Sequence, residues 1–220
     1  TEPAPLPFMD TPGAMNMEPC LSPDGRRLFF FSTRPRAAGE EPGNQDIWVM
    51  ERAGASWGEP RNLGEPVCTD DSEYFPSVTR DGTIYFTRNP KAAPREAAIW
   101  RARWRDGAYQ APEKLPAQVN CGTTHYNAFV APDESYVIVP TVGRPDGLGG
   151  TDYYVVFRNP DDTWQEPVNL GAAINTPDRP EWSPYVSPDG RCFFFMTSRF
   201  DPAWREPGAV KSWQDVRRMF

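Results

Sequence analysis

Apolar and polar positions along this chain fall into short blocks, and one arrangement of blocks recurs four times. In each copy a short run with apolar residues leads into an acidic turn, and a run of aromatic or β-branched residues follows. The acidic residues of the turns are 57, 52 and 56 positions apart, and they are Asp24, Asp81, Asp133 and Asp189. A period of about 55 residues punctuated by hairpin turns indicates a repeat protein built of short strands.

Two strand-length pieces flank each acidic turn. The first pieces are residues 20–22, 77–79, 129–131 and 185–187, and the second pieces are residues 28–31, 84–86, 137–139 and 193–195. An Asp-Gly pair suits a tight hairpin because both residues tolerate positive φ. The third copy has Asp133-Glu134 instead, so we expect a different or strained turn there.

Two further pieces complete the repeat. The third pieces are residues 46–50, 98–102 and 152–156, and the fourth pieces follow Pro60, Pro112 and Pro167. A proline that opens a strand is compatible with an outer edge, where no ladder hydrogen bond is lost. Four antiparallel strands in every repeat predict an all-β fold, a β-propeller of four-stranded blades with about four repeats visible. A solenoid is the competing repeat fold, but helical periodicity appears only in residues 212–220, where a short C-terminal helix is expected.

The phase of the repeats divides a single propeller domain, residues 1–220, into blades. Residues 1–18 are expected to hold the outer strand of a preceding or closing blade and a connector. Blades then span residues 19–67, 68–120 and 121–175, followed by a partial blade over residues 176–220. Either the first strand closes a four-bladed ring or the chain is an excerpt from a longer propeller. The second explanation is favoured because Pro3 has the phase of Pro60 without its preceding tryptophan.

Composition narrows the classes of partner. The chain has 220 residues, a formal net charge of −7, 13% aromatic residues and 26 prolines, which suits ordered short strands rather than disorder. The acidic balance argues against nucleic-acid binding, which needs clustered cations. No run of about 18 apolar residues is present, so we expect no membrane insertion. We also expect a monomer in solution. Arg101, Arg103 and Arg105 alternate along one predicted strand and are expected at a solvated edge.

The four cysteines are Cys20, Cys68, Cys121 and Cys192, and they form neither a CxxC pair nor a zinc-ligand spacing. Cys68 and Cys121 have nearly the same phase in successive repeats. A disulfide between them and four free thiols both remain open.

Candidate chemistry gathers just ahead of the first strands. Glu73, His125 and Glu181 share one phase, which would place them around one mouth of a propeller channel, with Glu18 nearby in the first repeat. His125 is the chain's one histidine, and a histidine among carboxylates can ligate a metal or act as a general base. These three are weak catalytic candidates, and a polar rim satisfied by water and backbone is the alternative.

Aromatic and acidic neighbours extend this candidate site. Tyr74, Tyr126 and Trp182 each follow a rim residue and would either stack on a sugar ring or pack between blades. The connecting loops carry further polar side chains that would bind calcium or a sugar, or serve as solvated turn residues: Asp70, Asp71, Asp178 and Arg179. A divalent metal such as calcium is the one cofactor that these residues suggest.

The turns also carry a family resemblance. Ser22-Pro23-Asp24-Gly25 and Ser187-Pro188-Asp189-Gly190 resemble the turn of the TolB-like, WD-repeat-like β-propellers of bacteria, and Arg80-Asp81-Gly82 and Pro132-Asp133-Glu134 match it in part. The resemblance covers roughly residues 1–200 and is specific for fold rather than activity. It implies a periplasmic or secreted protein and a parent of five or six blades.

These observations lead to a hypothesis of noncatalytic binding. We expect a scaffold propeller that engages a protein or a glycan at its channel rim, with alanine substitutions of Glu73, His125 and Glu181 altering ligand binding. The alternative is a carbohydrate-active or metal-assisted enzyme, a hydrolase or lyase that uses the same residues at the channel mouth. A third reading is an accessory domain whose partner activity lies elsewhere.

Overall fold

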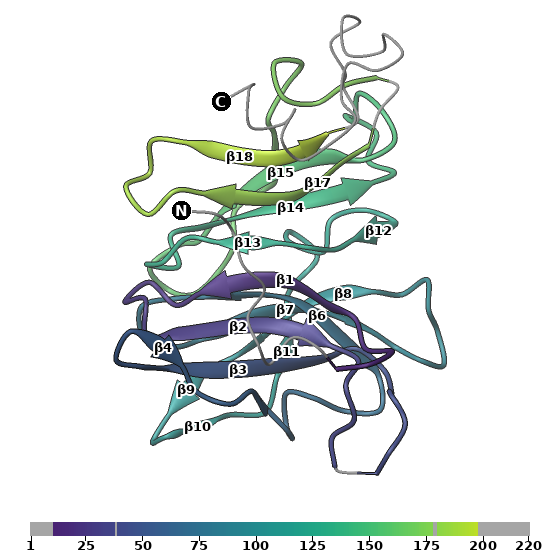
Figure 1. The fold of residues 1–220 in the computed structure, drawn as a ribbon. Helices are drawn as coiled ribbons and strands as arrows, with labels where there is room; N and C mark the ends of the chain where they lie inside the picture. The colour runs from purple at the N-terminus through teal and green to yellow at the C-terminus, as the bar shows by residue number, and fades with distance from the viewer. Residues whose placement is uncertain (1–10, 38, 178–179, 198–220) are drawn as a thin grey trace, which may run out of the picture.

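Each of the four repeats forms an antiparallel sheet of its own in a computed structural model that describes residues 11–37, 39–177 and 180–197 (Figure 1). Sheet 1 contains β1 (Asn16–Leu21), β2 (Arg27–Ser32), β3 (Asp46–Ala53), β4 (Ser56–Trp57) and β5 (Arg61–Asn62). Sheet 2 contains β6 (Ser72–Val78), β7 (Ile84–Asn89), β8 (Ala98–Ala102) and β11 (Glu113–Lys114), with a separate hairpin of β9 (Trp104–Arg105) and β10 (Ala108–Tyr109).

The later repeats follow the same order. Sheet 3 contains β12 (Thr124–His125), β13 (Phe129–Val130), β14 (Tyr136–Val142), β15 (Asp152–Phe157) and β16 (Val168–Asn169). Sheet 4 contains β17 (Glu181–Val186) and β18 (Phe193–Thr197). All paired strands are antiparallel, so the predicted all-β class is confirmed for the described residues, and sheets 1 to 3 have the predicted order of strands. We call β1, β6, the interrupted pair β12/β13, and β17 the first strands.

The core lies between successive sheets rather than within one of them. Sheets 1 and 2 enclose a cluster that includes Phe29, Ile47 and Phe86, and sheets 2 and 3 enclose one around Tyr85 and Val137. Phe129 and Tyr153 of sheet 3 pack against the aromatic strand β18 of sheet 4. The second strands of sheets 2 and 3 therefore have apolar side chains on both faces, because each contacts a neighbouring sheet on either side. Figure 1 shows the sheets of repeats 3 and 4 stacked over those of repeats 1 and 2.

The acidic turns share one hydrogen-bond pattern. Asp24 accepts from the hydroxyl of Ser22 at 2.6 Å and from the Arg26 N–H at 3.0 Å. Equivalent bonds to Asp81, Asp133 and Asp189 come from Thr79 and Thr83, from Ser135, and from Ser187 and Arg191. These hydroxyl and amide donors lower the pKa of Asp24, as they do in the other three turns. The aspartate therefore closes each hairpin through its side chain as well as its backbone.

The third turn has the same backbone hydrogen bond as the first and fourth turns, but a glutamate takes the positive-φ position of their glycine, so the turn is strained, as expected, and for a tertiary reason. Glu134 adopts a φ of 58°, and its buried carboxylate accepts a hydrogen bond from Tyr85 of sheet 2 at 2.8 Å. Arg158 of sheet 3 pairs with the same carboxylate at 3.3 Å. A glycine would relieve the backbone at this position but would remove the acceptor of the Tyr85 hydroxyl and one of the two carboxylate partners of Arg158.

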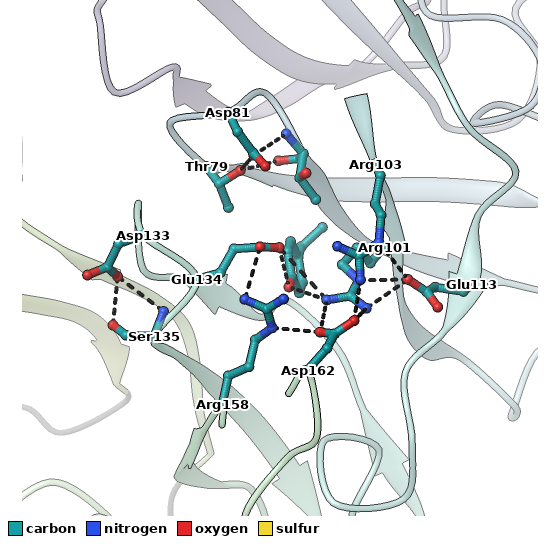
Figure 2. Close-up of polar contacts among 12 residues, drawn as sticks. Thr79, Asp81, Arg101, Arg103, Glu113, Asp133, Glu134, Ser135, Arg158 and Asp162 are labelled. Carbon is teal, nitrogen blue, oxygen red and sulfur yellow. Dashed lines mark hydrogen bonds and ion pairs between the residues drawn. The ribbon is translucent and has the colours of Figure 1, made fainter. Parts of the chain in front are cut away.

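An ion-pair network continues from Glu134 and joins sheets 2 and 3 (Figure 2). Arg101 of β8 is 3% exposed and donates two parallel hydrogen bonds to Asp162 at 2.9 and 3.0 Å. It also donates to Glu113 of β11 at 2.9 Å. The expectation of a solvated edge is therefore wrong for Arg101, because the carboxylate of the next repeat covers its guanidinium. Arg103 and Arg158 also pair with Asp162.

Asp162 should make the free energy of unfolding depend on pH in the acid range. Its hydrogen bonds to Arg101 hold its pKa well below the usual value. Because the pKa of Asp162 is lower in the folded state than in the unfolded chain, where it is about 3.9, ionised Asp162 stabilises the fold above that pH. This stability is lost as the pH falls through the pKa of the folded state. We expect Asp162→Asn to flatten the fall in the free energy of unfolding between about pH 4 and 2. Urea unfolding at several pH values measures this slope, with Asp70→Asn, a substitution of an exposed loop residue, as control. Equal slopes in wild type and Asp162→Asn would contradict the assignment.

Other expectations have mixed outcomes. The four cysteines are free, so a Cys68–Cys121 disulfide is wrong and free thiols are confirmed. No helix in the described part of the chain is long and apolar enough to cross a membrane. The N-terminal outer strand, the C-terminal helix, Asp178 and Arg179 lie outside the described residues.

Candidate functional site

A β-bulge interrupts the first strand of every repeat at the same position. The register of pairing shifts after Met17, Tyr74 and Trp182 in sheets 1, 2 and 4, and the first strand of sheet 3 breaks between β12 and β13. The residues at these positions have φ values of 57°, 51°, 52° and 58°, and they are Glu18, Phe75, Asn127 and Ser183. Positive φ is costly for residues other than glycine, and bulges often re-aim a side chain near a functional site.

Three bulge side chains meet although they come from three different sheets. The amide of Asn127 lies 3.4 Å from a carboxylate oxygen of Glu18 and 3.4 Å from the hydroxyl of Ser183. The other oxygen of Glu18 accepts a hydrogen bond from the backbone N–H of Phe75 at 2.8 Å. We call Glu18, Asn127 and Ser183 the bulge cluster. Its members are 109 and 56 positions apart along the chain.

Burial dominates the electrostatics of the bulge cluster. It raises the pKa of Glu18 to about 7, although the hydrogen bonds from Phe75 and Asn127 act in the opposite direction. Within the described ranges, no lysine or arginine forms an ion pair with Glu18. Asn127 is 7% exposed, and its side-chain oxygen has no hydrogen-bond partner. The cluster therefore holds a carboxylate without a cation and an amide oxygen without a donor.

Aromatic side chains accompany the bulges in three repeats. Tyr74, Tyr126 and Trp182 each precede a bulge residue, and all three are partly exposed. The carboxylate of Glu18 and the phenol of Tyr126 lie near Tyr74, whose pKa burial raises to about 12. Tyr126 contacts the hydroxyl of Thr151 at 3.2 Å. The structure thus places these residues, predicted as ligand contacts, beside a polar cluster.

Glu73 and Glu181 anchor loops. Glu73 is 0% exposed and accepts hydrogen bonds from the N–H and hydroxyl of Thr69 and from Arg88, at 2.7–3.1 Å. Glu181, also 0% exposed, accepts from the N–H and hydroxyl of Thr176 at 3.4 and 2.6 Å. Both carboxylates tie the incoming loop to the first strand.

His125 occupies the same position in sheet 3 without the same contacts. It is 8% exposed, and burial lowers its pKa to about 4, so the ring is neutral at pH 7. Its Nδ1 has no hydrogen-bond partner. Among the described residues, His125 belongs to no group of side chains that are close enough to share a metal ion with Glu73 or Glu181. A role for the three residues in ligand binding stays a prediction.

One group of potential metal ligands does occur in the described part of the chain, between sheets 1 and 2. Asp46, Cys68 and Glu73 each place one ligand atom within 4.8 Å of the others. Arg36 already pairs with Asp46 at 2.5 Å, and Arg88 pairs with Glu73 at 2.8 Å.

Cys68 has a backbone partner of its own. Its sulfur exchanges hydrogen bonds with the N–H and carbonyl of Ile47, and burial raises the pKa of the thiol to about 12. Asn120 and Asn175 bridge the equivalent strands β8 and β15 in the same way. Cys68 therefore replaces a structural asparagine, and the group is an ion-paired core element rather than a metal centre.

The acidic loop residues Asp70 and Asp71 are more exposed than Glu73 and have fewer hydrogen-bond partners. Asp70 is exposed, and Asp71 accepts a hydrogen bond from the N–H of Lys91 at 3.0 Å. That contact is typical of a turn residue.

Sequence reasoning identified Glu18 but missed Asn127 and Ser183. Each lies six positions before the acidic residue of its turn, as Glu18 does. That shared phase was the available signal, but only the bulge directs the three side chains toward one another.

Comparisons with known proteins give information on the fold of this chain only. No protein-family model matches the chain, and no curated protein matches its sequence. TolB from Acinetobacter baumannii is 17% identical, with a TM-score of 0.45, over 80% of this chain and 36% of that one. A putative 6-phosphogluconolactonase from Bacteroides uniformis is 13% identical, with a TM-score of 0.45, over 87% of this chain and 50% of that one.

A third solved structure is a protein of unknown function from Dyadobacter fermentans. It is 15% identical, with a TM-score of 0.51, over 86% of this chain and 67% of that protein. The chain thus spans 36% and 50% of the lengths of the TolB and lactonase structures. At these identities, the chain has a fold similar to that of the Dyadobacter protein.

Proposed function

We propose that this chain is part of a TolB-like β-propeller and acts as a noncatalytic binding module for a glycan. The four sheets are its blades, in a parent of five or six blades, and the first strands line the channel. The module is monomeric and periplasmic or secreted, as the resemblance of its Ser-Pro-Asp-Gly turns suggests.

One observation carries the glycan assignment. Three successive first strands place a partly exposed aromatic side chain, Tyr74, Tyr126 or Trp182, directly before a bulge residue. Sugar rings bind through apolar contact with aromatic faces and hydrogen bonds to a few fixed polar groups. The bulge cluster supplies such polar groups beside the aromatic ones.

The burial and contacts of Glu73, Glu181 and His125 favour binding over catalysis. Glu73 and Glu181 are fully buried, with their oxygens occupied by hydrogen bonds. His125 is buried as a neutral ring. A general acid or base must reach the substrate proton, and these three side chains face neighbouring protein atoms instead.

Glycan binding can be measured directly. The 220-residue chain would be screened on an oligosaccharide array, and the best ligand titrated by calorimetry. Trp182→Ala and Tyr74→Ala should each weaken binding by about 10-fold, equivalent to about 1.4 kcal/mol. Phe157→Ala is the matched control because Phe157 is an exposed aromatic residue on β15, outside the first strands.

Two results would overturn the proposal. Specific turnover of a glycan by wild type, lost in Glu73→Ala, His125→Ala and Glu181→Ala variants that remain folded, would establish the enzyme alternative. Binding to a peptide array without binding to glycans would assign a protein ligand instead.

A further inference from the structure

We propose that a cleft between sheets 1 and 2 binds an acidic sugar, whose carboxylate is held by Arg27 and Arg61. One wall of this inter-sheet cleft is the hairpin of β9 and β10, and the other wall consists of β2, β3 and the segment around β5 (Figure 1). No residue that lines the cleft belongs to a first strand. The inference therefore does not rest on the glycan site proposed at the bulges, because the two sites have no residue in common.

Two adjoining hollows make up the inter-sheet cleft. Their volumes are about 330 Å³ and 640 Å³, and both are lined by Arg27, Glu51 and Trp104. Volumes of about 300–1,000 Å³ are typical of sites for small molecules. The smaller hollow also has apolar walls, to which Phe29, Val49, Leu63, Pro66 and Tyr109 contribute.

Arg27 lies between aromatic rings from both walls. Its Cζ is 5.6 Å from the ring centroid of Phe29 and 5.7 Å from that of Trp104. Trp104 is held in turn by an edge contact with Tyr109, with 4.7 Å between ring centroids, and by the close approach of Gly82. Contact with aromatic faces attracts the guanidinium charge without occupying its N–H donors. Arg27 is therefore positioned in the cleft with its donors still unused.

The other charged side chains of the cleft also have unused hydrogen-bonding capacity. Within the described residues, neither Arg27 nor Arg61 forms an ion pair or donates a side-chain hydrogen bond, and the carboxylates of Glu51 and Glu65 accept none. Over both hollows, four arginines and three acidic residues leave an excess of one positive charge, although the whole chain carries −7. A ligand with one negative charge and several hydroxyl groups matches this lining.

A hexuronic acid, a sugar with one carboxylate, offers the matching groups. Its carboxylate accepts hydrogen bonds from guanidinium groups, which bind carboxylates in a paired geometry. Its hydroxyl groups donate to the carboxylates of Glu51 and Glu65, and the C–H face of its ring packs against the apolar wall. Inorganic phosphate has the charge but no apolar face, and a neutral sugar lacks the charge. The larger hollow provides room for the neighbouring sugar of a chain.

A titration of the full 220-residue chain by NMR, with the sodium salts of glucuronic and galacturonic acid in turn, tests the site at pH 7. The better of the two should bind with a Kd of about 1 mM, as expected for a ligand of this size. It should shift the indole N–H signal of Trp104, which is assigned with Trp104→Phe. Glucose and inorganic phosphate should bind at least about 10-fold more weakly, because each lacks one of the recognised groups.

Two arginine variants test the role of the cations. Arg27→Gln should weaken uronate binding by at least about 10-fold, because it removes hydrogen bonds to a charged group. Arg61→Gln should weaken it by about 3-fold, since Arg61 is exposed. Arg95→Gln is the matched control because it removes the same charge from an exposed arginine outside the cleft. Trp182→Ala should also bind uronate as wild type does, which separates this site from the one at the bulges.

Thermal unfolding of each variant shows whether a loss of binding reflects a loss of the fold. An unmoved Trp104 signal in folded wild type at about 10 mM of either uronate would overturn the proposal. Equal affinities for uronate and inorganic phosphate would overturn sugar recognition, and equal affinities for uronate and glucose would overturn recognition of the carboxylate. Unchanged uronate affinity in folded Arg27→Gln and Arg61→Gln would overturn the assigned cations.

Discussion

Replacing Arg101 with methionine is expected to lower the free energy of unfolding by about 3–5 kcal/mol, because breaking a buried ion pair strands its partners. Arg101 is 3% exposed and donates to Asp162 of sheet 3 as well as to Glu113. Its removal also takes a donor from the hydroxyl of Tyr85 and leaves the buried Glu134 with fewer cations. Chemical denaturation at pH 7 gives the magnitude.

A nearby arginine provides the control for this prediction. Arg103 pairs with the same two carboxylates, Glu113 and Asp162, but its side chain is 25% exposed. Arg103→Met should therefore cost no more than about 1 kcal/mol, as is typical of partly solvated pairs. Equal effects of the two substitutions would show that the network does not join the sheets as described.

The Glu73→Ala variant is expected to lose about 3–5 kcal/mol of unfolding free energy for a related reason. Glu73 accepts hydrogen bonds from Thr69 and pairs with Arg88, whose guanidinium stacks on Trp100 with 4.8 Å between its Cζ and the ring centroid. Without the carboxylate, Arg88 retains only carbonyl acceptors, among them Val67 at 2.9 Å. Thermal and urea unfolding measure the loss.

Two companion variants make the Glu73 experiment specific. Asp70→Ala removes an exposed acid from the same loop and should change stability by less than about 0.5 kcal/mol. Glu73→Leu combined with Arg88→Met should recover part of the loss, since it removes both charges and fills the space. A double variant no more stable than Glu73→Ala would indicate that the loop contacts with Thr69 matter more than the charge pair.

The repeat architecture was readable from the sequence because its signals are local. In each hairpin an aspartate accepts a hydrogen bond from a serine or threonine hydroxyl two residues away, before it in three turns and after it at Asp133, so the pattern is visible at any point of the chain. The third strand of sheet 2 was predicted at residues 98–102 and is β8, Ala98–Ala102. The strained turn at Asp133-Glu134 was also visible locally, as the absence of glycine.

The reason for a glutamate in that strained turn was not local. Glu134 accepts a hydrogen bond from Tyr85, 49 positions away, and Arg101 reaches Asp162 over 61 positions. Alternation along a strand predicts only which face a side chain occupies. It cannot say whether that face meets water or the carboxylates of another sheet, so Arg101 was wrongly expected at a solvated edge.

The residues of the candidate site could also be predicted only in part from the sequence. Phase along the sequence selected Glu73, His125 and Glu181, which do occupy one register position: each is buried, opposite the end of the second strand of its sheet. It also selected Glu18, Tyr74, Tyr126 and Trp182 near the bulges. The sequence phase did not reveal the bulges. A bulge interrupts the alternation of side chains along the strand, and it thereby brings the side chains of Asn127 and Ser183 close to Glu18.

By itself, the sequence determined the strands, the turns and their period, because hydrophobic alternation and turn chemistry act over a few residues. Only the tertiary structure decided which polar groups are buried, which are paired and which meet across repeats. Burial and pairing depend on atoms supplied by distant segments, and they set whether a carboxylate anchors a loop, as Glu73 does, or remains without a cation, as Glu18 does.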